Sequence, residues 1–208
     1  MNNTTIDIKE SINQHVIPYL SLDRKLRGLD QRAYASDLEK QFTDYAQQNL
    51  DNTIQASSVK STDDITIDGT LVDVKTSNID GKFKMPNLIS ISKLKKIFYN
   101  KELLYSIVVY SSEEGRVLEN HSYYIWELPW EHLAIQNLGK GQLQIKDMKK
   151  FIDDIDNFPK ITKDEWYQEF INRGSLFYQA LVEKTEERLE DWNACLLYTS
   201  PSPRDGLL

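Results

Sequence analysis

The sequence predicts an α/β fold with a central mixed β-sheet of about five strands flanked by helices. Segments with apolar residues three and four positions apart, typical of amphipathic helices, alternate with segments rich in β-branched and aromatic residues. Residues 103–111 are almost continuously apolar, as expected of a strand buried on both faces. Residues 64–75 alternate around Asp68 and Gly69, a pair that favours the type I′ turn of a β-hairpin.

The predicted elements follow one another along most of the chain. Helices are expected over residues 5–20, 36–49, 86–99, 129–138 and 162–192. Strands are expected over residues 54–60, 64–75 (as a hairpin), 103–111, 117–128 and 142–146. Two helices begin with capping boxes, Ser36 with Glu39 and Thr162 with Glu165. We expect residues 1–194 to fold as a single domain, because 208 residues is an ordinary length for one hydrophobic core.

The residues from Cys195 onward differ in kind from the rest. The stretch from Cys195 to Asp205 resembles the translation of a transposase-type sequencing adapter, so we expect residues 195–208 to be a non-native tail. The sequence has no other cysteine, which excludes disulfides, cysteine nucleophiles and cysteine metal sites from residues 1–194. No apolar run is long enough to span a membrane, and the N-terminus lacks the features of a signal peptide. We therefore expect a cytoplasmic protein with no membrane partner.

The charge distribution leaves two interpretations open. The net charge of −7 argues against a nucleic-acid partner, but the acidic excess lies largely beyond residue 147. Residues 75–101 contain a single acid, Asp80, and seven lysines: Lys75, Lys82, Lys84, Lys93, Lys95, Lys96 and Lys101. These lysines are either a solvated helix face or a surface that contacts phosphate groups.

The predicted hairpin carries the chemistry. Its two-residue turn fixes a register that places Asp64 directly opposite Asp73, with Cβ atoms about 4.5–5.5 Å apart. Two carboxylates about 4 Å apart repel by about 4 kcal/mol at an effective dielectric constant of about 20. The pair therefore favours a bound cation, and Mg²⁺ is the natural one. Lys75 shares the face of Asp73 and would stabilise the charge that develops in phosphodiester hydrolysis, or orient and deprotonate the attacking water.

Other roles are open for the same residues. Glu39 could supply a third carboxylate, or it could serve only as the last residue of its capping box. Asp64 could simply flank the turn, and a triplet such as Asp73-Val-Lys75 often occurs by chance. Each of these residues alone has an ordinary explanation. The predicted cross-strand pairing of the two aspartates is what favours a functional site.

The residues around Asp73 resemble a known group of nucleases. Asp64 with Asp73-Val-Lys75 resembles the PD-(D/E)xK motif, and residues 71–79 and 86–94 resemble type II restriction endonucleases of the HincII kind. Weaker similarity reaches residues 38–50 and 162–166. Asp63 stands where the motif name has proline, and the spacing from Asp64 to Asp73 is shorter than the family leads us to expect.

The resemblance implies Mg²⁺-dependent cleavage of double-stranded DNA by a homodimer, at a short and nearly palindromic site and with blunt ends. It implies a metal held by Asp64, Asp73 and Val74. Lys75 would be the catalytic lysine, and Glu39 an accessory catalytic acid. The residues that it implies at the DNA are Asn78, Lys82, Phe83, Lys84, Asn87, Ser90 and Lys93.

Within that set, Phe83 and Lys84 lie where the family inserts residues between bases, and Asn87 lies where it reads base edges. Lys84 replaces a smaller or neutral residue, which leaves the target sequence open. Two other functions are also open. One is a repair nickase or junction resolvase of the same superfamily, and the other is a non-catalytic DNA-binding module in which the motif is coincidental.

Overall fold

The computed structural model describes residues 7–22, 31–50, 54–56, 63–80, 86–136 and 141–199. The chain divides into two compact units, Met1–Tyr167 and Gln168–Leu208, and every strand of the described residues belongs to the first. This unit has an α/β fold with a mixed five-stranded sheet flanked by helices, which confirms the predicted fold class. Among the described residues, no helix is both long enough and apolar enough to cross a membrane.

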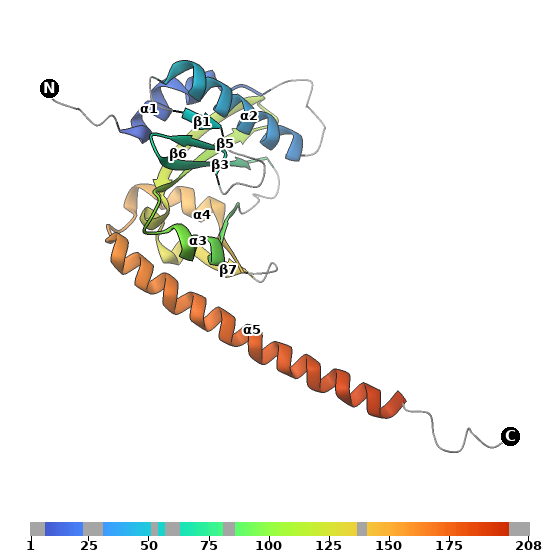
Figure 1. Ribbon diagram of the computed structural model, residues 1–208. Coiled ribbons are helices and arrows are strands. Elements are labelled where there is room, and N and C mark those ends of the chain that lie inside the picture. Colours follow the sequence, from blue (N-terminus) through green and yellow to red (C-terminus); the bar gives the residue numbers. More distant parts are fainter. Residues whose placement is uncertain are drawn as a thin grey trace, which may run out of the picture. The chain divides into compact units, whose positions relative to one another are not determined.

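The five-stranded sheet has the order β1-β2-β3-β5-β6 (Figure 1). Its strands are β1 (Ile54–Ala56), β2 (Ile65–Ile67), β3 (Thr70–Asn78), β5 (Leu103–Ser111) and β6 (Arg116–Tyr124). β3 and β5 run parallel and the other neighbouring pairs run antiparallel, so the sheet is mixed, as predicted. All nine residues of β5 are buried, as expected of an apolar strand that lies between two others.

A tight turn at Asp68 and Gly69 joins β2 to β3 and fixes their register. Both residues have positive φ angles, 48° at Asp68 and 84° at Gly69, as a type I′ turn requires. The ladder pairs Ile67 with Thr70 and continues in the same register to the end of β2. The register predicted for the hairpin is therefore confirmed over the length of β2.

Helices α1 (Ile8–His15) and α2 (Gln31–Asn49) cover one face of this sheet (Figure 1). Their apolar side chains share one core with alternate residues of the strands, and its members include Ile12, Leu38, Phe42, Ile65, Ile67, Val72, Val74, Leu104 and Val108. Because side chains alternate along a strand, the β3 residues in this core leave Asp73 and Lys75 on the other face.

Both N-terminal helices have boundaries other than those predicted. The helix predicted over residues 5–20 is shorter, and Pro18 lies in a separate 3₁₀ turn, Ile17–Tyr19. α2 begins at Gln31, so Ser36 lies inside the helix and the capping box predicted with Glu39 is wrong. The backbone N–H groups of a helix interior are already bonded to carbonyls one turn back, so Ser36 has no orphan donor to cap.

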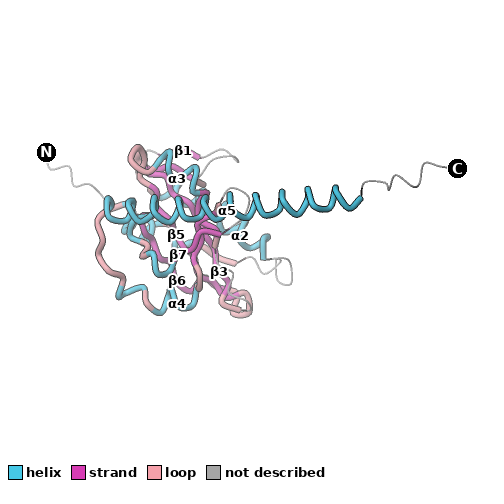
Figure 2. The backbone as a smooth tube through the Cα atoms, turned by 90° about the horizontal axis from the view of Figure 1, so that it is seen from below, coloured by secondary structure: helices cyan, strands magenta, loops and turns pink. Residues whose placement is uncertain are grey.

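A second sheet, of three strands in the order β4-β8-β7, lies on the side of the first sheet opposite α1 and α2 (Figures 1 and 2). Its strands are β4 (Asn87–Ser90), β8 (Gln142–Ile145) and β7 (Leu133–Gln136). The accompanying helices are α3 (Ile91–Ile97) and α4 (Met148–Asp153).

Two of the predicted helices are wrong over part of their length in this region. Residues 87–90 and 133–136 are strands, although helices were predicted over 86–99 and 129–138. Both strands pair with β8, and this strand pairing overrides the helical spacing of their apolar residues. Residues 137–140, at the end of the second predicted helix, lie outside the described residues.

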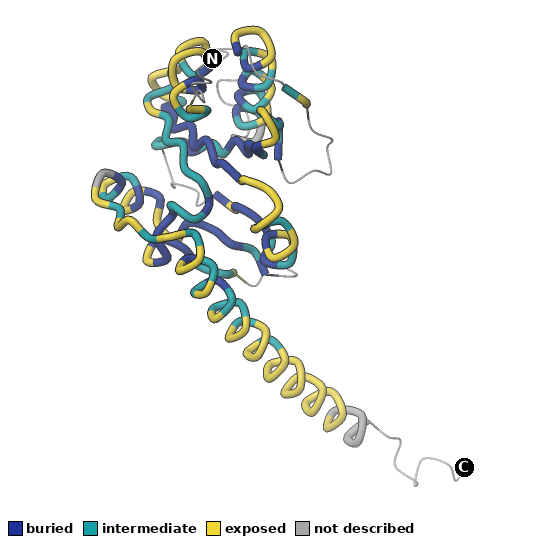
Figure 3. The backbone as a smooth tube through the Cα atoms, turned by 60° about the vertical axis from the view of Figure 1, so that its left-hand side comes forward, coloured by how far each residue is buried: buried dark blue, intermediate teal, exposed yellow. Residues whose placement is uncertain are grey.

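α5 (Lys163–Thr199) begins at the second predicted capping box, which the structure confirms. The Thr162 N–H donates to Glu165 Oε2 at 2.9 Å, and the Glu165 N–H donates to Thr162 Oγ1 at 3.2 Å. Trp166 is fully buried, and its Nε1 donates to the carbonyl of Leu128 at 2.8 Å. The helix continues into the expected non-native tail, and its residues in the second unit are mostly exposed (Figure 3).

Two glycine substitutions should change stability in opposite directions. Gly69→Ala forces a side chain into the left-handed region, so we expect the free energy of unfolding to fall by about 1–2 kcal/mol. Gly174→Ala lies inside α5 with no atom within 4 Å of the new Cβ, so it should raise stability by about 0.5–1 kcal/mol. Urea unfolding of both variants checks the pair, and a stabilising Gly69→Ala would contradict the turn assignment.

Candidate active site

The two predicted aspartates meet at the end of the β2–β3 hairpin that lies away from the turn. The ladder ends where Ile65 pairs with Val72, and Asp64 and Asp73 are the residues that adjoin this last pair on the two strands. The Asp64 N–H donates to the carbonyl of Val72 at 3.0 Å, and its Oδ2 accepts the N–H of Val74 at 2.7 Å. These two bonds hold the Asp64 carboxylate against β3.

Asp73 is only 4% exposed although it carries a carboxylate. Lys75, on the same face of β3, donates from Nζ to Asp73 Oδ1 at 2.5 Å and keeps 22% of its side chain exposed. Burial raises the pKa of Asp73 to about 8 against the lowering effect of the Lys75 ammonium, and the Asp64 carboxylate adds to the rise. Ionising both aspartates at neutral pH therefore requires more positive charge than Lys75 supplies.

Glu39 belongs to the same electrostatic environment, although it comes from α2. It lies in the middle of that helix and not at its start, so no capping role accounts for it. Burial raises the pKa of the half-buried Glu39 carboxyl, the charge of Asp64 raises it further, and Lys75 lowers it. Glu39 therefore lies within electrostatic range of Asp64 and Lys75, the two residues whose charges also act on Asp73.

The aspartate pair fits an Mg²⁺ site that uses one or two carboxylates and leaves positions for water and substrate oxygens. The observation behind this fit is the donor set: two carboxylates lie together at the end of the hairpin, and a divalent cation beside them would favour their ionised forms. Among the described residues, no group of three or more Asp, Glu, His or Cys side chains is arranged to hold a metal. Val74 has a fully buried apolar side chain and can offer only its backbone carbonyl.

Sequence reasoning missed two buried hydroxyl groups on the face of the sheet that carries Asp73. Tyr105 is the register partner of Asp73 on β5, and Ser77 lies on β3 beyond Lys75. Within the described part of the chain, neither hydroxyl has a hydrogen-bond partner. Their position follows from the parallel register of β3 and β5, which no local sequence pattern reveals.

Asn78, predicted to contact DNA, is built into the scaffold at the end of β3. Its Nδ2 donates to Ser112 Oγ at 2.9 Å, and its Oδ1 accepts the N–H groups of Asp80 and Ser112. The side chain is 7% exposed. The amide therefore ties the end of β3 to the turn between β5 and β6.

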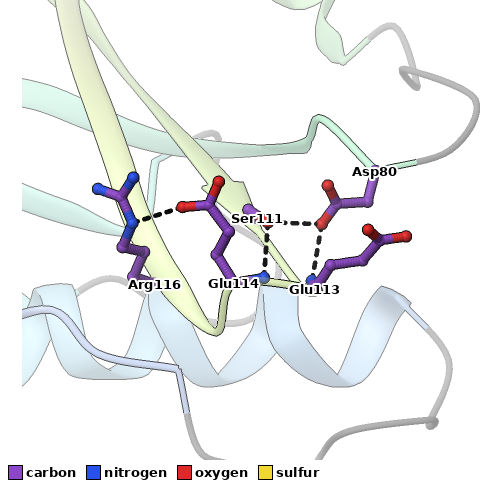
Figure 4. Close-up of polar contacts among 5 residues, drawn as sticks. All are labelled: Asp80, Ser111, Glu113, Glu114 and Arg116. Carbon is purple, nitrogen blue, oxygen red and sulfur yellow. Dashed lines mark hydrogen bonds and ion pairs between the residues drawn. The ribbon is translucent and has the colours of Figure 1, made fainter.

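Asp80 reinforces the same connection (Figure 4). Its Oδ2 accepts hydrogen bonds from Ser111 Oγ and from the N–H of Glu113, both at 2.8 Å. These bonds, led by that from Glu113, lower the pKa of the Asp80 carboxyl. Together, the Asn78 and Asp80 side chains form a clamp, the β3 clamp, that fixes the chain where it leaves the sheet.

The other residues predicted to contact DNA lie further along the chain. Asn87 is exposed at the start of β4, and Ser90 ends that strand with its Oγ 3.4 Å from Ser92 Oγ. Lys93 is exposed on α3. Residues 82–84, which include Lys82, Phe83 and Lys84, lie outside the described residues.

Comparison with known proteins adds no relative to this picture. No protein-family model matches the chain. A search of curated protein sequences finds no significant match. The functional proposal therefore rests on the residues of the site and on their geometry.

The raised pKa of Asp73 predicts a pH-dependent stability when no divalent cation is present. A carboxyl whose pKa is raised from 3.8 to about 8 contributes its stability in full below about pH 4 and loses it as the pH rises to about 8. Asp73→Asn removes this dependence, so its stability advantage over the natural chain should grow across that range, by about 1.4 kcal/mol for each pKa unit at most. Urea unfolding in EDTA at several pH values measures the difference, and parallel pH profiles would contradict it.

Two serine substitutions on neighbouring strands form a matched pair. Ser106 Oγ donates to Asn120 Oδ1 at 2.7 Å, whereas Ser77 Oγ is buried without a partner among the described residues. Ser106→Ala should therefore lower the free energy of unfolding by about 1 kcal/mol, and Ser77→Ala should leave it unchanged or raise it by up to about 1 kcal/mol. Chemical denaturation tests the contrast, and equal losses in the two variants would show that Ser77 has a partner.

Proposed function

We propose that the chain is an Mg²⁺-dependent deoxyribonuclease that hydrolyses phosphodiester bonds in double-stranded DNA. The observation that carries the proposal is the set of Asp64, Asp73 and Lys75 at one end of a hairpin, with Asp73 buried and its pKa raised. Carboxyl groups with perturbed pKa values cluster at functional sites, and a bound cation would stabilise the ionised form of this one. Sequence-specific cleavage of the type II restriction kind is the form of this activity that the motif favours.

The side chains have separable roles in such a reaction. Asp64 and Asp73 would hold Mg²⁺, which when bound neutralises phosphate charge and acidifies the attacking water. The Lys75 ammonium, partly exposed beside Asp73, would donate to phosphate oxygens on which negative charge develops. Glu39, whose pKa burial raises, would accept a proton from water more readily than an ordinary carboxylate.

Cutting both strands at one site implies two copies of this arrangement. A symmetric homodimer places two equivalent sites on the two antiparallel strands of a duplex, and a nearly palindromic target matches that symmetry. We therefore propose the homodimer and the nearly palindromic target together with the cleavage reaction.

Plasmid cleavage in Mg²⁺ tests the proposed function. The natural chain should give discrete linear fragments, and Asp73→Ala and Lys75→Ala should each lower the rate by about a hundredfold or more. Glu39→Gln should lower it by a smaller factor, because that residue acts as an accessory. The matched controls are Asp44→Ala on α2 and Lys149→Ala on α4, both exposed, and both should cleave normally.

The products of the same assay separate the alternatives. Fragments that persist in both Asp73→Ala and Lys75→Ala would overturn the assignment of the site. A nicked circle as the end product would indicate a nickase, and cutting only at branched or structured DNA would indicate a resolvase. Binding of DNA by the natural chain without any Mg²⁺-dependent cleavage would indicate a binding module.

A further inference from the structure

The outer side of α3 carries lysines and no acids. Four exposed lysines, which we name the α3 lysine face, lie on the helix and the turn that follows it: Lys93, Lys95, Lys96 and Lys101. No Asp or Glu occurs between Asp80 and Glu102 in the sequence. Among the described residues, none of the four lysines forms an ion pair.

The rest of the chain shows how unusual this face is. The protein carries a net charge of −7. The exposed lysines of α4, Lys149 and Lys150, are flanked by Asp147, Asp153 and Asp154, so positive and negative charges alternate there. A solvated helix face normally mixes both signs in this way. Acids border the α3 lysine face at its C-terminal end, where Glu102 follows Lys101 and Asp164 accepts a hydrogen bond from Tyr99, but the four lysines outnumber them, and this positive excess favours an anionic partner.

Packing holds the α3 lysine face in place. Ile91, Leu94 and Phe98 are each at most 2% exposed, so the inner side of the helix is anchored in the core. α3 also follows β4 without a loop, because Ser90 ends the strand and Ile91 begins the helix. The helix that carries three of the lysines is therefore held on the side of the five-stranded sheet to which Asp73 and Lys75 belong (Figure 1).

We propose that the α3 lysine face binds the phosphate backbone of double-stranded DNA and supplies the sequence-independent part of its affinity. This inference deepens the proposed function and rests on it for the identity of the polymer. A duplex presents regularly spaced negative charges, and lysines that neutralise them release condensed counterions. Contacts to phosphates also fix the register of a protein on the duplex, which would orient β4 and the aspartate pair.

The salt dependence of duplex binding tests the inference. The natural chain and a fourfold α3 variant (Lys93→Gln, Lys95→Gln, Lys96→Gln, Lys101→Gln) are titrated in EDTA, where no strand is cut. The slope of log affinity against log salt should shrink by about 3–4 in the variant, because each lost phosphate contact removes about 0.9. The fourfold Lys→Arg variant at the same positions should keep the slope, since it keeps the charge.

A control of equal charge change makes the result specific to this surface. The fourfold change to Gln at four other exposed lysines, Lys149, Lys150, Lys160 and Lys184, should leave the slope within about one of the natural value. Equal losses in both fourfold variants would overturn the inference, because net charge alone would then explain binding. Binding of the natural chain to phosphatidylserine vesicles but not to duplex would overturn it as well.

Failure of this inference and failure of the proposed function give different results. If the natural chain cleaves plasmid and the α3 variant cleaves it with unchanged KM and salt dependence, the inference fails and the nuclease stands. If the α3 variant loses duplex binding while the natural chain never cleaves, the inference stands and the nuclease fails.

Discussion

The burial of Asp73 beside a second aspartate is the constraint on which the rest of the site depends. An acid that is 4% exposed and has its pKa raised to about 8 costs stability whenever it is ionised without an added cation. Such a position persists only where the surrounding structure fixes it, because otherwise the side chain would turn to solvent. Three features fix it: the Asp68–Gly69 turn, the bond from the Val74 N–H to Asp64, and the apolar core beneath β3.

One face of β3 is apolar and packs in the core, and the other face carries the charged side chains. On one face, Val72 and Val74 pack under α1 and α2, and their burial gives the strand its stability. On the other face, Asp73 and Lys75 hold charges that burial alone would disfavour. Apolar and polar residues alternate along this one strand. The packing of Val72 and Val74 in the core therefore also fixes the position of Asp73 and Lys75 on the opposite face.

Local patterns were sufficient for the features that are local in origin. The Asp68–Gly69 turn, the register of the hairpin, the buried run of β5 and the capping box at Thr162 all follow from residues close in the sequence. These features also determine which face of β3 carries Asp73 and Lys75. The core of the candidate site was therefore within reach of the sequence alone.

Features that depend on distant partners were out of reach. β4 pairs with the distant β8, which overrides the helical spacing of its own residues, whereas β7 pairs with β8 across a short connection. Ser36 followed by Glu39 reads as a helix start, yet α2 begins at Gln31. The positions of Tyr105 and Ser77 beside the site require the parallel pairing of β3 with β5, which joins segments separated by β4 and α3.

The β3 clamp has a consequence for how such a protein could evolve. The Asn78 and Asp80 side chains bind the end of the strand to Ser111, Ser112 and Glu113 at the β5–β6 turn. A mutation or insertion directly after residue 80 acts on a strand end that is already anchored, so it should transmit little displacement to Asp73 or Lys75. The positions of these two charges are thereby insulated from changes in the chain that follows the clamp.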